Sequence, residues 1–382
     1  MKAVAFISTM KGAPWGGSEE LWSRSALCLR KRGHDVITSS LRWPNPAPRL
    51  LELRSAGIAV TYQKPLSRTL AARAWRKTAG KVKWGTDERA RWLKKHRPDF
   101  VVVSQGANLD GIQWMATCAR LSVPYFAVVQ CNSECWWPKA DQQEAVAAAY
   151  RGARRVYCVS RRNLELLEDQ LGEELSNAKV IRNPVNLTPG DPVPWPGENE
   201  ICKIACVARL DTFAKGQDLL IRVMARDRWK ARPVRMTLYG KGSSELRLRS
   251  LAENLGIADR IAFAGHVDDI RDVWARNELL VLPSRFEGLP LALVEAMYCA
   301  RPAVVTDVGG NAEACVDGET GYIAGAPSTS LLDQALERAW AERCRWPMMG
   351  QAARSRVEQL NQRDPVEAFC DDLEDWAAGR PA

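Results

Sequence analysis

The sequence has little histidine and lacks the short motifs that hold metal ions. Its 382 residues include only three histidines, no Asp-x-Asp, and 11 scattered cysteines without a Cys-x-x-Cys pair. Zinc sites need paired Cys or His ligands at short, regular spacing, so the sequence predicts no such site. Scattered cysteines in an odd number are typical of a reducing compartment, which favours a cytoplasmic location.

Long apolar runs are missing as well. No stretch reaches the 18 apolar residues that indicate a membrane-spanning helix. The apolar run at 3–8 is too short for a signal peptide and leads into a glycine-rich loop, so we expect a first strand there. No G-x-G-x-x-G follows the first strand of either half of the chain. This absence argues against an NAD dehydrogenase.

Positive charge is concentrated in one segment of a chain whose net charge is +9. Between Arg68 and Arg97 lie eleven Lys and Arg residues, two acidic residues and three tryptophans. One interpretation is a solvated helical face. The other is a patch that rests on an anionic membrane surface, with tryptophans at the interface. Nucleic acid is not an expected partner, because no nucleic-acid-binding module accompanies the patch.

Strand and helix signals alternate along the whole chain, which is typical of parallel sheets covered by helices. The length suits two domains of about 180 residues each. We expect an N-terminal domain at 1–186, a Pro- and Gly-rich linker at 187–199 and a C-terminal domain at 200–362. A last helix at about 363–382 is expected to pack back on the N-terminal domain. In open α/β sheets the ligand lies at the carboxyl ends of the strands.

The most informative segment runs from Val281 to Glu295. An apolar strand ends, Glu287 follows in a loop, Gly288 and Pro290 open a helix, and Glu295 lies on that helix. At helical rise the two carboxylates are about 12 Å apart along the axis, and the free N–H groups of the first turn lie near Glu287. A long anionic ligand with hydroxyl groups at both ends fits this pattern.

This segment resembles the E-x7-E element of retaining glycosyltransferases of the GT-B fold, family 4 type. The resemblance implies an α/β protein with two Rossmann-like domains that face a cleft. It assigns the donor sugar to Glu287, backbone N–H contacts to Gly288 and Leu289, and the ribose hydroxyls to Glu295. The stretch Val207-Ala-Arg-Leu-Asp-Thr-Phe-Ala-Lys-Gly also resembles the family, and Arg209 and Lys215 are the matching cations for the donor diphosphate.

Further segments match the same family. Gly16 and Gly17, before a helix, match the loop that closes over the donor phosphate and sugar. Val267, in Phe263-Ala-Gly-His-Val, matches the segment that holds the nucleobase through backbone groups. The neighbouring histidine is expected to be an ordinary exposed loop residue.

The chain departs from the family at Gln130, where many members carry a histidine near the donor sugar. Glutamine forms hydrogen bonds but does not act as a base. Front-face attack, in which the departing phosphate takes the acceptor's proton, needs no protein base. Gln130, Asn132 and Trp136 are the candidates for the acceptor side, and the tryptophan is equally compatible with a core position.

The predicted function is transfer of a sugar from a nucleotide-sugar donor to a glycan, lipid-linked or small-molecule acceptor, in bacterial polysaccharide or glycoconjugate synthesis. No metal or cofactor is expected, because two cations replace the metal electrostatically. The predicted location is the cytoplasm, with the inner face of the membrane as an option. Two alternatives stay open: a nucleotide-sugar epimerase of the same fold and a catalytically silent nucleotide-sugar-binding protein. The sequence does not identify the base, the sugar, the acceptor or the oligomeric state.

Overall fold

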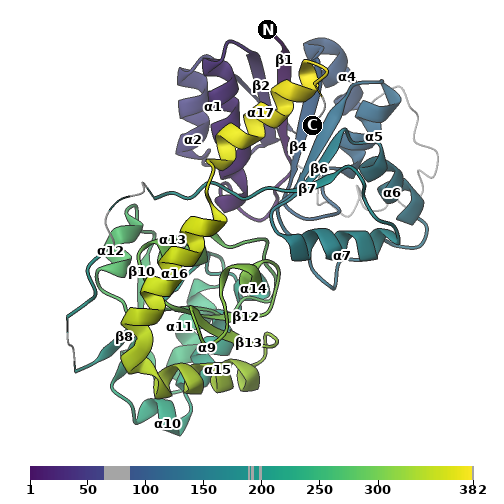
Figure 1. Ribbon diagram of the computed structural model, residues 1–382. Coiled ribbons are helices and arrows are strands. Elements are labelled where there is room, and N and C mark those ends of the chain that lie inside the picture. The colour runs from purple at the N-terminus through teal and green to yellow at the C-terminus, as the bar shows by residue number, and fades with distance from the viewer. Residues whose placement is uncertain (64–86, 188–189, 191–192, 198–199, 381–382) are drawn as a thin grey trace. The chain divides into compact units, whose positions relative to one another are not determined.

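The computed structural model describes residues 1–63, 87–187, 190, 193–197 and 200–380 (Figure 1). Contacts divide the chain into two compact units. The N-terminal unit comprises Met1–Val159, Leu164–Asn183 and Asp364–Ala382, and the C-terminal unit comprises Ser160–Asn163 and Pro184–Arg363. The chain therefore crosses between the units more than once, and each unit is described by itself.

The N-terminal unit contains a seven-stranded parallel sheet in the order β3-β2-β1-β4-β5-β6-β7. Its strands are β1 (Ala3–Ser8), β2 (Asp35–Leu41), β3 (Ala59–Gln63), β4 (Phe100–Gln105), β5 (Tyr125–Val129), β6 (Arg155–Cys158) and β7 (Ala178–Val180). Every residue of β4 and β5 is buried, because helices cover both faces of the sheet. Continuous apolar runs such as Phe-Val-Val-Val in β4 follow from this two-sided burial.

The helices of this unit are η1 (Gly17–Glu19), α1 (Glu20–Lys31), α2 (Pro48–Ser55), α4 (Glu88–His96), α5 (Ile112–Arg120), α6 (Gln143–Arg151), α7 (Arg161–Leu171) and α17 (Pro365–Ala377). One core cluster joins the sheet to α1, α2 and α17, and a second joins it to α4, α5, α6 and α7. The sheet is therefore wound on both faces.

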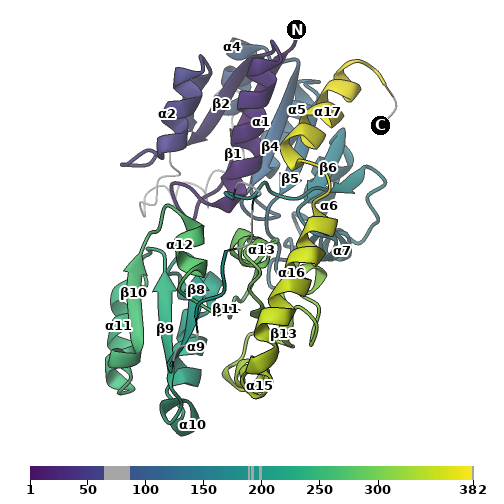
Figure 2. The ribbon, with the colours of Figure 1, turned by 60° about the vertical axis from the view of Figure 1, so that its left-hand side comes forward.

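Helix α17 completes the N-terminal unit from the far end of the sequence, and Figures 1 and 2 show it beside the first strands and helices. Phe369, Cys370 and Leu373 are fully buried. Asp364 caps the helix by accepting hydrogen bonds from two backbone N–H groups of the first turn. Arg32, the C-cap residue of α1, forms ion pairs with three carboxylates of α17. Apolar packing and charge both hold α17 against α1.

The C-terminal unit contains a six-stranded parallel sheet in the order β10-β9-β8-β11-β12-β13. The strands are β8 (Cys202–Val207), β9 (Val234–Tyr239), β10 (Ile261–Gly265), β11 (Leu279–Leu282), β12 (Ala303–Thr306) and β13 (Gly321–Ala324). The helices are α8 (Thr212–Lys215), α9 (Gln217–Met224), α10 (Asp227–Lys230), α11 (Glu245–Asn254), η3 (Ala258–Arg260), α12 (Ile270–Trp274), α13 (Leu291–Tyr298), α14 (Asn311–Ala314), α15 (Thr329–Ala341), η4 (Arg343–Arg345) and α16 (Trp346–Leu360).

Two core clusters cover the two faces of this second sheet. One contains apolar side chains of α9, α10, α11 and α15, and the other contains those of α12, α13, α14 and α16. In both units the strand order reverses beside the first strand, between β1 and β4 and between β8 and β11. Such a switch point is where open α/β sheets bind ligands.

The strand expected at 3–8 is β1 with those bounds, and the apolar strand expected before Glu287 is β11. The arrangement of the two sheets around a cleft stays a prediction. Most of the basic segment between Arg68 and Arg97 lies outside the described residues, and only its last part is described, with α4.

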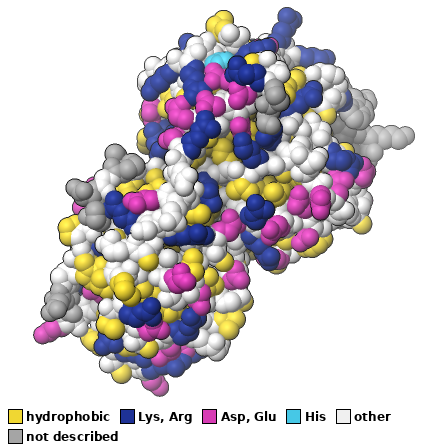
Figure 3. Space-filling view, viewed as in Figure 1, with side chains coloured by type: hydrophobic (Ala, Val, Ile, Leu, Met, Phe, Trp, Pro, Cys, Tyr) yellow, Lys and Arg dark blue, Asp and Glu magenta, His cyan; other side chains and the backbone are white. Residues whose placement is uncertain are grey.

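Charge on the described surface is mixed in sign, as the space-filling view shows for one face (Figure 3). In the part of the chain that the structure describes, no helix has both the length and the apolar character needed to cross a bilayer.

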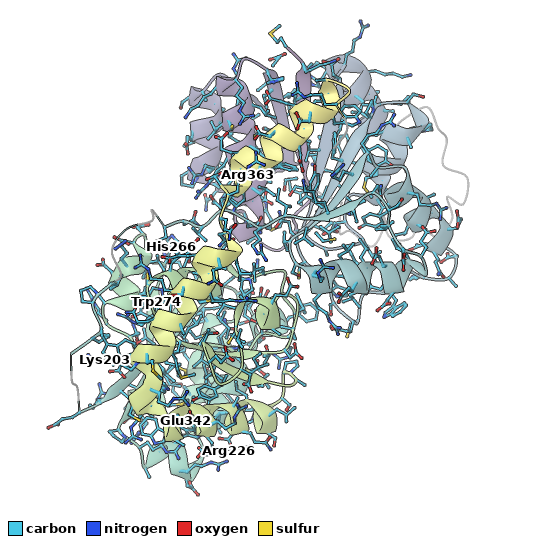
Figure 4. The ribbon with its side chains drawn as sticks, in the orientation of Figure 1. Lys203, Arg226, His266, Trp274, Glu342 and Arg363 are labelled. Carbon is cyan, nitrogen blue, oxygen red and sulfur yellow. The ribbon has the colours of Figure 1, made fainter. Side chains whose placement is uncertain are left out.

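A buried arginine ties the linker to the C-terminal unit. Arg301 is 1% exposed. Its guanidinium donates hydrogen bonds to the carbonyl oxygens of Val193, Pro194, Trp274, Asn277, Cys299 and Ala300. Trp274, labelled in Figure 4, is itself fully buried on α12. Burial lowers the pKa of Arg301 to about 10, so the side chain stays charged at neutral pH.

Replacement Arg301→Met should destabilise the C-terminal unit strongly. The apolar side chain leaves several buried carbonyl oxygens without a donor, which costs about 3–5 kcal/mol. The midpoint of thermal unfolding should fall by about 10 °C. Arg247→Met, on the exposed face of α11, is the matched control and should shift the midpoint by about 1 °C or less. Equal midpoints for the two variants would contradict the role of Arg301.

Candidate functional site

The candidate site of the C-terminal unit lies at the carboxyl ends of β8 and β11. These two strands pair in parallel at the centre of the sheet, with Leu279 opposite Ile204. Arg209 follows β8 directly, and Glu287 lies in the loop between β11 and α13. The switch point of the sheet therefore brings the two loops that carry the predicted residues to one edge.

Glu287 is buried, and its carboxylate accepts hydrogen bonds from two described side chains. It is 5% exposed. The Nζ of Lys215 donates to its Oε1 at 2.6 Å, and the Oγ of Ser284 donates to the same oxygen at 2.7 Å. A buried carboxylate needs such partners, and a cation is the strongest of them. The structure thus joins two residues that lie 72 positions apart in the sequence.

Lys215 reaches Glu287 from the last turn of α8. Asp211 caps this short helix, because its side chain accepts a hydrogen bond from the N–H of Phe213 at 3.1 Å. Gly216 ends the helix with φ of +61°, and a Cβ there would lie 2.0 Å from the carbonyl oxygen of Pro283. Only glycine lets the α8 loop approach the end of β11 this closely.

Arg285 fixes the α8 loop against the β11 loop a second time. Its guanidinium forms a bidentate ion pair with Asp218, and both N–O distances are 2.8 Å. Its backbone N–H donates to the carbonyl oxygen of Ala214 at 2.8 Å. Asp218 holds the pKa of Arg285 above its usual value. The sequence analysis did not single out Arg285, whose only signal was its position two residues before Glu287.

Arg209 lies in the same loop region with less restraint. Its side chain is about one third exposed and pairs with Asp211 at 3.1 Å. Its buried Nε has no hydrogen-bond partner among the described residues. The amide of Gln217 holds the backbone by donating to the carbonyl oxygen of Arg209 at 2.8 Å. The backbone of Arg209 is anchored while its side chain keeps unused donor capacity.

The residues after Glu287 are held by a neighbouring glycine turn. The carbonyl oxygen of Gly288 accepts a hydrogen bond from Gly310 at 2.6 Å. Gly309 has φ of +51°, and a Cβ there would lie 2.3 Å from the carbonyl oxygen of Glu287. Leu289 is buried, and the N-cap residue of α13, Pro290, supplies no side-chain cap. The first turn of α13 is thus fixed without an acidic cap of its own.

Glu295 and Val267 take positions away from the contact between Lys215 and Glu287. Glu295 is buried on α13, and its Oε1 accepts a hydrogen bond from the backbone N–H of Asn186 at 3.3 Å. Val267 follows β10 and packs, half-buried, on the apolar cluster of that face. His266, labelled in Figure 4, is exposed and lies 3.6 Å from Asp268.

In the N-terminal unit, Gly16 and Gly17 lie in the loop after β1. Gly16 has extended backbone, and a Cβ there would meet no described atom closer than 4.0 Å. Packing within the unit therefore does not require glycine at this position. Gly17 begins the short helix η1, which leads directly into α1.

Glu19 of η1 is a buried carboxyl group beside this glycine loop. It is 3% exposed, and the Oγ of Ser8 donates to its Oε2 at 2.7 Å. Burial raises the pKa of Glu19 to about 7, and the nearby charge of Glu20 adds to the increase. From the sequence Glu19 looked like an ordinary acidic residue at a helix start, because nothing local showed that it would be desolvated.

The three acceptor-side candidates belong to buried amide contacts of the N-terminal unit. Gln130 follows β5, accepts a hydrogen bond from the amide of Asn183 at 2.7 Å, and has a buried Nε2 without a partner among the described residues. Asn132 donates to Gln170 at 2.9 Å. The carbonyl oxygen of Trp136 accepts from Asn108 at 3.0 Å. Asn108 also bonds Gln170, so one amide network holds Asn132 and Trp136.

Among the residues that the structure describes, no group of three or more His, Cys, Asp or Glu side chains is arranged to hold a metal ion.

Two models of known protein families match the chain. The family model described as "Glycosyl transferases group 1" matches residues 202–342, and that described as "Glycosyltransferase Family 4" matches residues 15–188. Together the two models cover most of both units. The chain belongs to these glycosyltransferase families. The family predicted from the sequence is confirmed.

Two curated relatives align with part of the chain. D-inositol 3-phosphate glycosyltransferase of Gordonia bronchialis is 35% identical over 166 residues, which are 41% of this chain and 36% of that protein. N-acetyl-alpha-D-glucosaminyl L-malate synthase of Bacillus anthracis is 32% identical over 136 residues, 35% of this chain and 36% of that protein. The chain thus spans about a third of the length of these relatives.

Solved structures match the fold over almost the whole chain. Anabaena HepE in complex with UDP has a TM-score of 0.72 at 18% identity and covers 99% of this chain and 100% of that one. WaaG, a glycosyltransferase involved in lipopolysaccharide biosynthesis, has a TM-score of 0.67 at 18% identity and covers 96% and 98%. These likenesses, with the two parallel sheets, confirm the predicted GT-B fold class.

The titration of Glu19 should make the N-terminal unit less stable as pH rises. The folded carboxyl titrates at about 7 and the unfolded one near 4.5, so between these values the folded state holds the extra proton. From pH 5 to pH 8 the free energy of unfolding should fall by about 2.5 kcal/mol relative to Glu19→Gln, whose amide does not titrate.

Chemical denaturation at both pH values measures this difference. Glu144→Gln, which changes an exposed carboxylate of the same unit, is the matched control and should follow the wild type. Parallel pH curves for the wild type and Glu19→Gln would show that Glu19 is not desolvated.

Proposed function

We propose that the protein is a retaining glycosyltransferase that moves a sugar from a nucleotide-sugar donor to an acceptor hydroxyl. The observation that supports this most directly is the contact of Lys215 with the buried Glu287 at the switch point, with Arg209 in the adjoining loop. A carboxylate for sugar hydroxyls and two cations for a diphosphate are the groups that such a donor needs.

The two cations would stabilise the leaving nucleoside diphosphate, which gains charge as the glycosidic bond breaks. Lys215 has three donor hydrogens, so it can hold Glu287 and still bind a phosphate oxygen. Arg209 offers its planar fork, with the unpaired Nε already buried in the loop. Both charges are in place before the donor arrives, which limits the reorganisation needed during the reaction.

The remaining donor contacts would come from the other matched residues. Glu287 orients the sugar hydroxyls, backbone N–H groups of Gly288 and Leu289 bind phosphate, and Glu295 binds the ribose. Val267 holds the base through its backbone. The N-terminal loop at Gly16 and Gly17, which packing leaves open at Gly16, would approach the phosphate and sugar.

The acceptor hydroxyl would attack from the side of the leaving group. Its proton passes to the departing phosphate oxygen, so no protein base is used, in keeping with Gln130 at the end of β5. No metal or cofactor takes part in this scheme, since Arg209 and Lys215 supply the positive charge. The acceptor would be a glycan, a lipid-linked sugar or a small molecule.

Calorimetric titration with UDP, GDP, ADP and TDP would identify the donor base. UDP is the first nucleotide to test, because the similarly folded HepE was solved with UDP.

Arg209→Met should lower kcat/KM by about 10²- to 10³-fold, since one preorganised cation for the leaving group is lost. The partly exposed side chain has Asp211 as its ion-pair partner, so the midpoint of thermal unfolding should stay within about 2 °C of the wild type. Arg247→Met again provides the control. Full activity of Arg209→Met on a working donor would contradict the assignment.

Glu287→Gln separates donor binding from turnover. The amide keeps an acceptor for Lys215 and Ser284 but removes the charge that faces the sugar. Turnover should fall by at least about tenfold while affinity for the free nucleoside diphosphate changes little. A loss of nucleotide affinity with unchanged turnover would reverse the assigned roles.

The epimerase alternative is tested by incubating the donor without an acceptor. Formation of an epimer would favour it, whereas a donor that stays unchanged until an acceptor is added favours transfer. A protein that binds the nucleotide and performs neither reaction with any acceptor would be the silent binding protein.

A further inference from the structure

A cavity of about 300 Å³ lies in the C-terminal unit apart from the residues assigned to the donor. Its lining side chains come from α12, α13 and the end of α16 with the turn after it. They are Arg271, Tyr298, Arg354, Glu358, Asn361 and Gln362. None of these residues belongs to the proposed donor site, although Tyr298 lies one helical turn after Glu295. The size is that of a small-molecule site at the lower end of the usual range.

The cavity carries one net positive charge, because two arginines line it against one glutamate. Glu358 pairs with the Nε of Arg354 at 2.8 Å, and the Nη2 of Arg354 donates to the carbonyl oxygen of Gly190 at 2.8 Å. The Nη1 of Arg354 is buried and has no hydrogen-bond partner among the described residues. The guanidinium of Arg354 is thus held in place by Glu358 and Gly190 beside Arg271, and two arginines at one cavity favour an anionic ligand.

Three further lining side chains are polar and uncharged, and Leu187 adds an apolar contact. Tyr298 offers a hydroxyl group, and Asn361 and Gln362 offer amides that both donate and accept hydrogen bonds. Such groups bind the hydroxyls of a sugar, whereas a purely apolar ligand would leave them unpaired. Arginine pairs with phosphate through its planar fork. The lining therefore combines phosphate recognition with hydroxyl recognition in a space for one small molecule.

We propose that this cavity binds a small phosphorylated sugar, with its phosphate on Arg271 and Arg354 and its hydroxyls on Tyr298, Asn361 and Gln362. The site is separate from the proposed donor site and does not depend on the proposed function.

The cavity lies at both segments that connect the two units along the chain. Leu187 and Gly190 of the linker also line it, just after the chain leaves the N-terminal unit at Asn183. Gln362 lies just before the chain returns to that unit at Asp364. A bound ligand therefore contacts both of these connecting segments and restrains them together.

Calorimetric titration of the full chain with glucose 6-phosphate, glucose and inorganic phosphate tests the proposal. Glucose 6-phosphate should bind more tightly than inorganic phosphate, and glucose should not bind measurably. Arg271→Met and Arg354→Met should each weaken binding at least about tenfold. Arg247→Met, an exposed arginine of the same unit, should bind as the wild type does.

Thermal unfolding of each variant accompanies the titrations, because Arg354 also holds the linker at Gly190. If Arg354→Met has a lower midpoint of thermal unfolding than the wild type, the test rests on Arg271→Met alone. Absence of glucose 6-phosphate binding in the wild type, or equal binding in Arg271→Met and Arg247→Met, would overturn the proposal. Equal affinity for glucose 6-phosphate and inorganic phosphate would overturn the sugar assignment.

The donor site is a rival position for a sugar phosphate, and two further measurements separate the sites. Binding of glucose 6-phosphate should persist in Arg209→Met and in the presence of saturating UDP. Binding that disappears in either case would assign the ligand to the donor site and overturn the proposal. Titration of Arg271→Met with UDP, GDP, ADP and TDP tests the proposed function separately. If none of these nucleotides binds, the proposed function fails, but the result for the cavity stands.

Discussion

The contact of Lys215 with Glu287 is the interaction on which the rest of the C-terminal site depends. A carboxylate that is 5% exposed is stable in its charged form only with a partner, and the lysine is that partner. The ion pair can form because Gly216 lets α8 come within contact of the end of β11. Arg285 holds the same two loops from the other side. The close backbone approach at Gly216 allows the ion pairs to form, and the ion pairs in turn hold the two loops together.

The N-terminal unit uses a different principle. Its candidate region contains amides and a carboxyl group of raised pKa, while the C-terminal region contains ion pairs. Amide groups such as Gln130 and Asn132 bond neutral partners and direct hydrogen bonds without fixing a charge. The proposed reaction between a charged donor and an acceptor hydroxyl calls for environments of these two kinds.

The fold class could be predicted from the sequence more completely than the site of the C-terminal unit. Alternating strand and helix signals were enough for two parallel sheets. Glu287 was singled out by its place between a strand and a helix, whereas Arg209 and Lys215 were assigned through the resemblance to the family. Arg285 and Glu19 were not found, since an isolated charge in a sequence looks the same whether it is solvated or buried. Their roles arise from segments packed far apart in the chain, such as Ser8 against Glu19 and Asp218 against Arg285. The amide network around Asn108 depends on tertiary contacts in the same way.

Helix α17 has a consequence for the order in which the protein is made. Its side chains Phe369 and Leu373 are part of the core of the N-terminal unit, yet they are translated only after the C-terminal unit. Domains usually fold as units, and the N-terminal one first during synthesis. Here the sheet built from β1 to β7 must wait, with the part of one face that α17 covers open to solvent, until translation has passed through the whole second unit. Nascent chains stalled before residue 364 would therefore expose an apolar surface for chaperones.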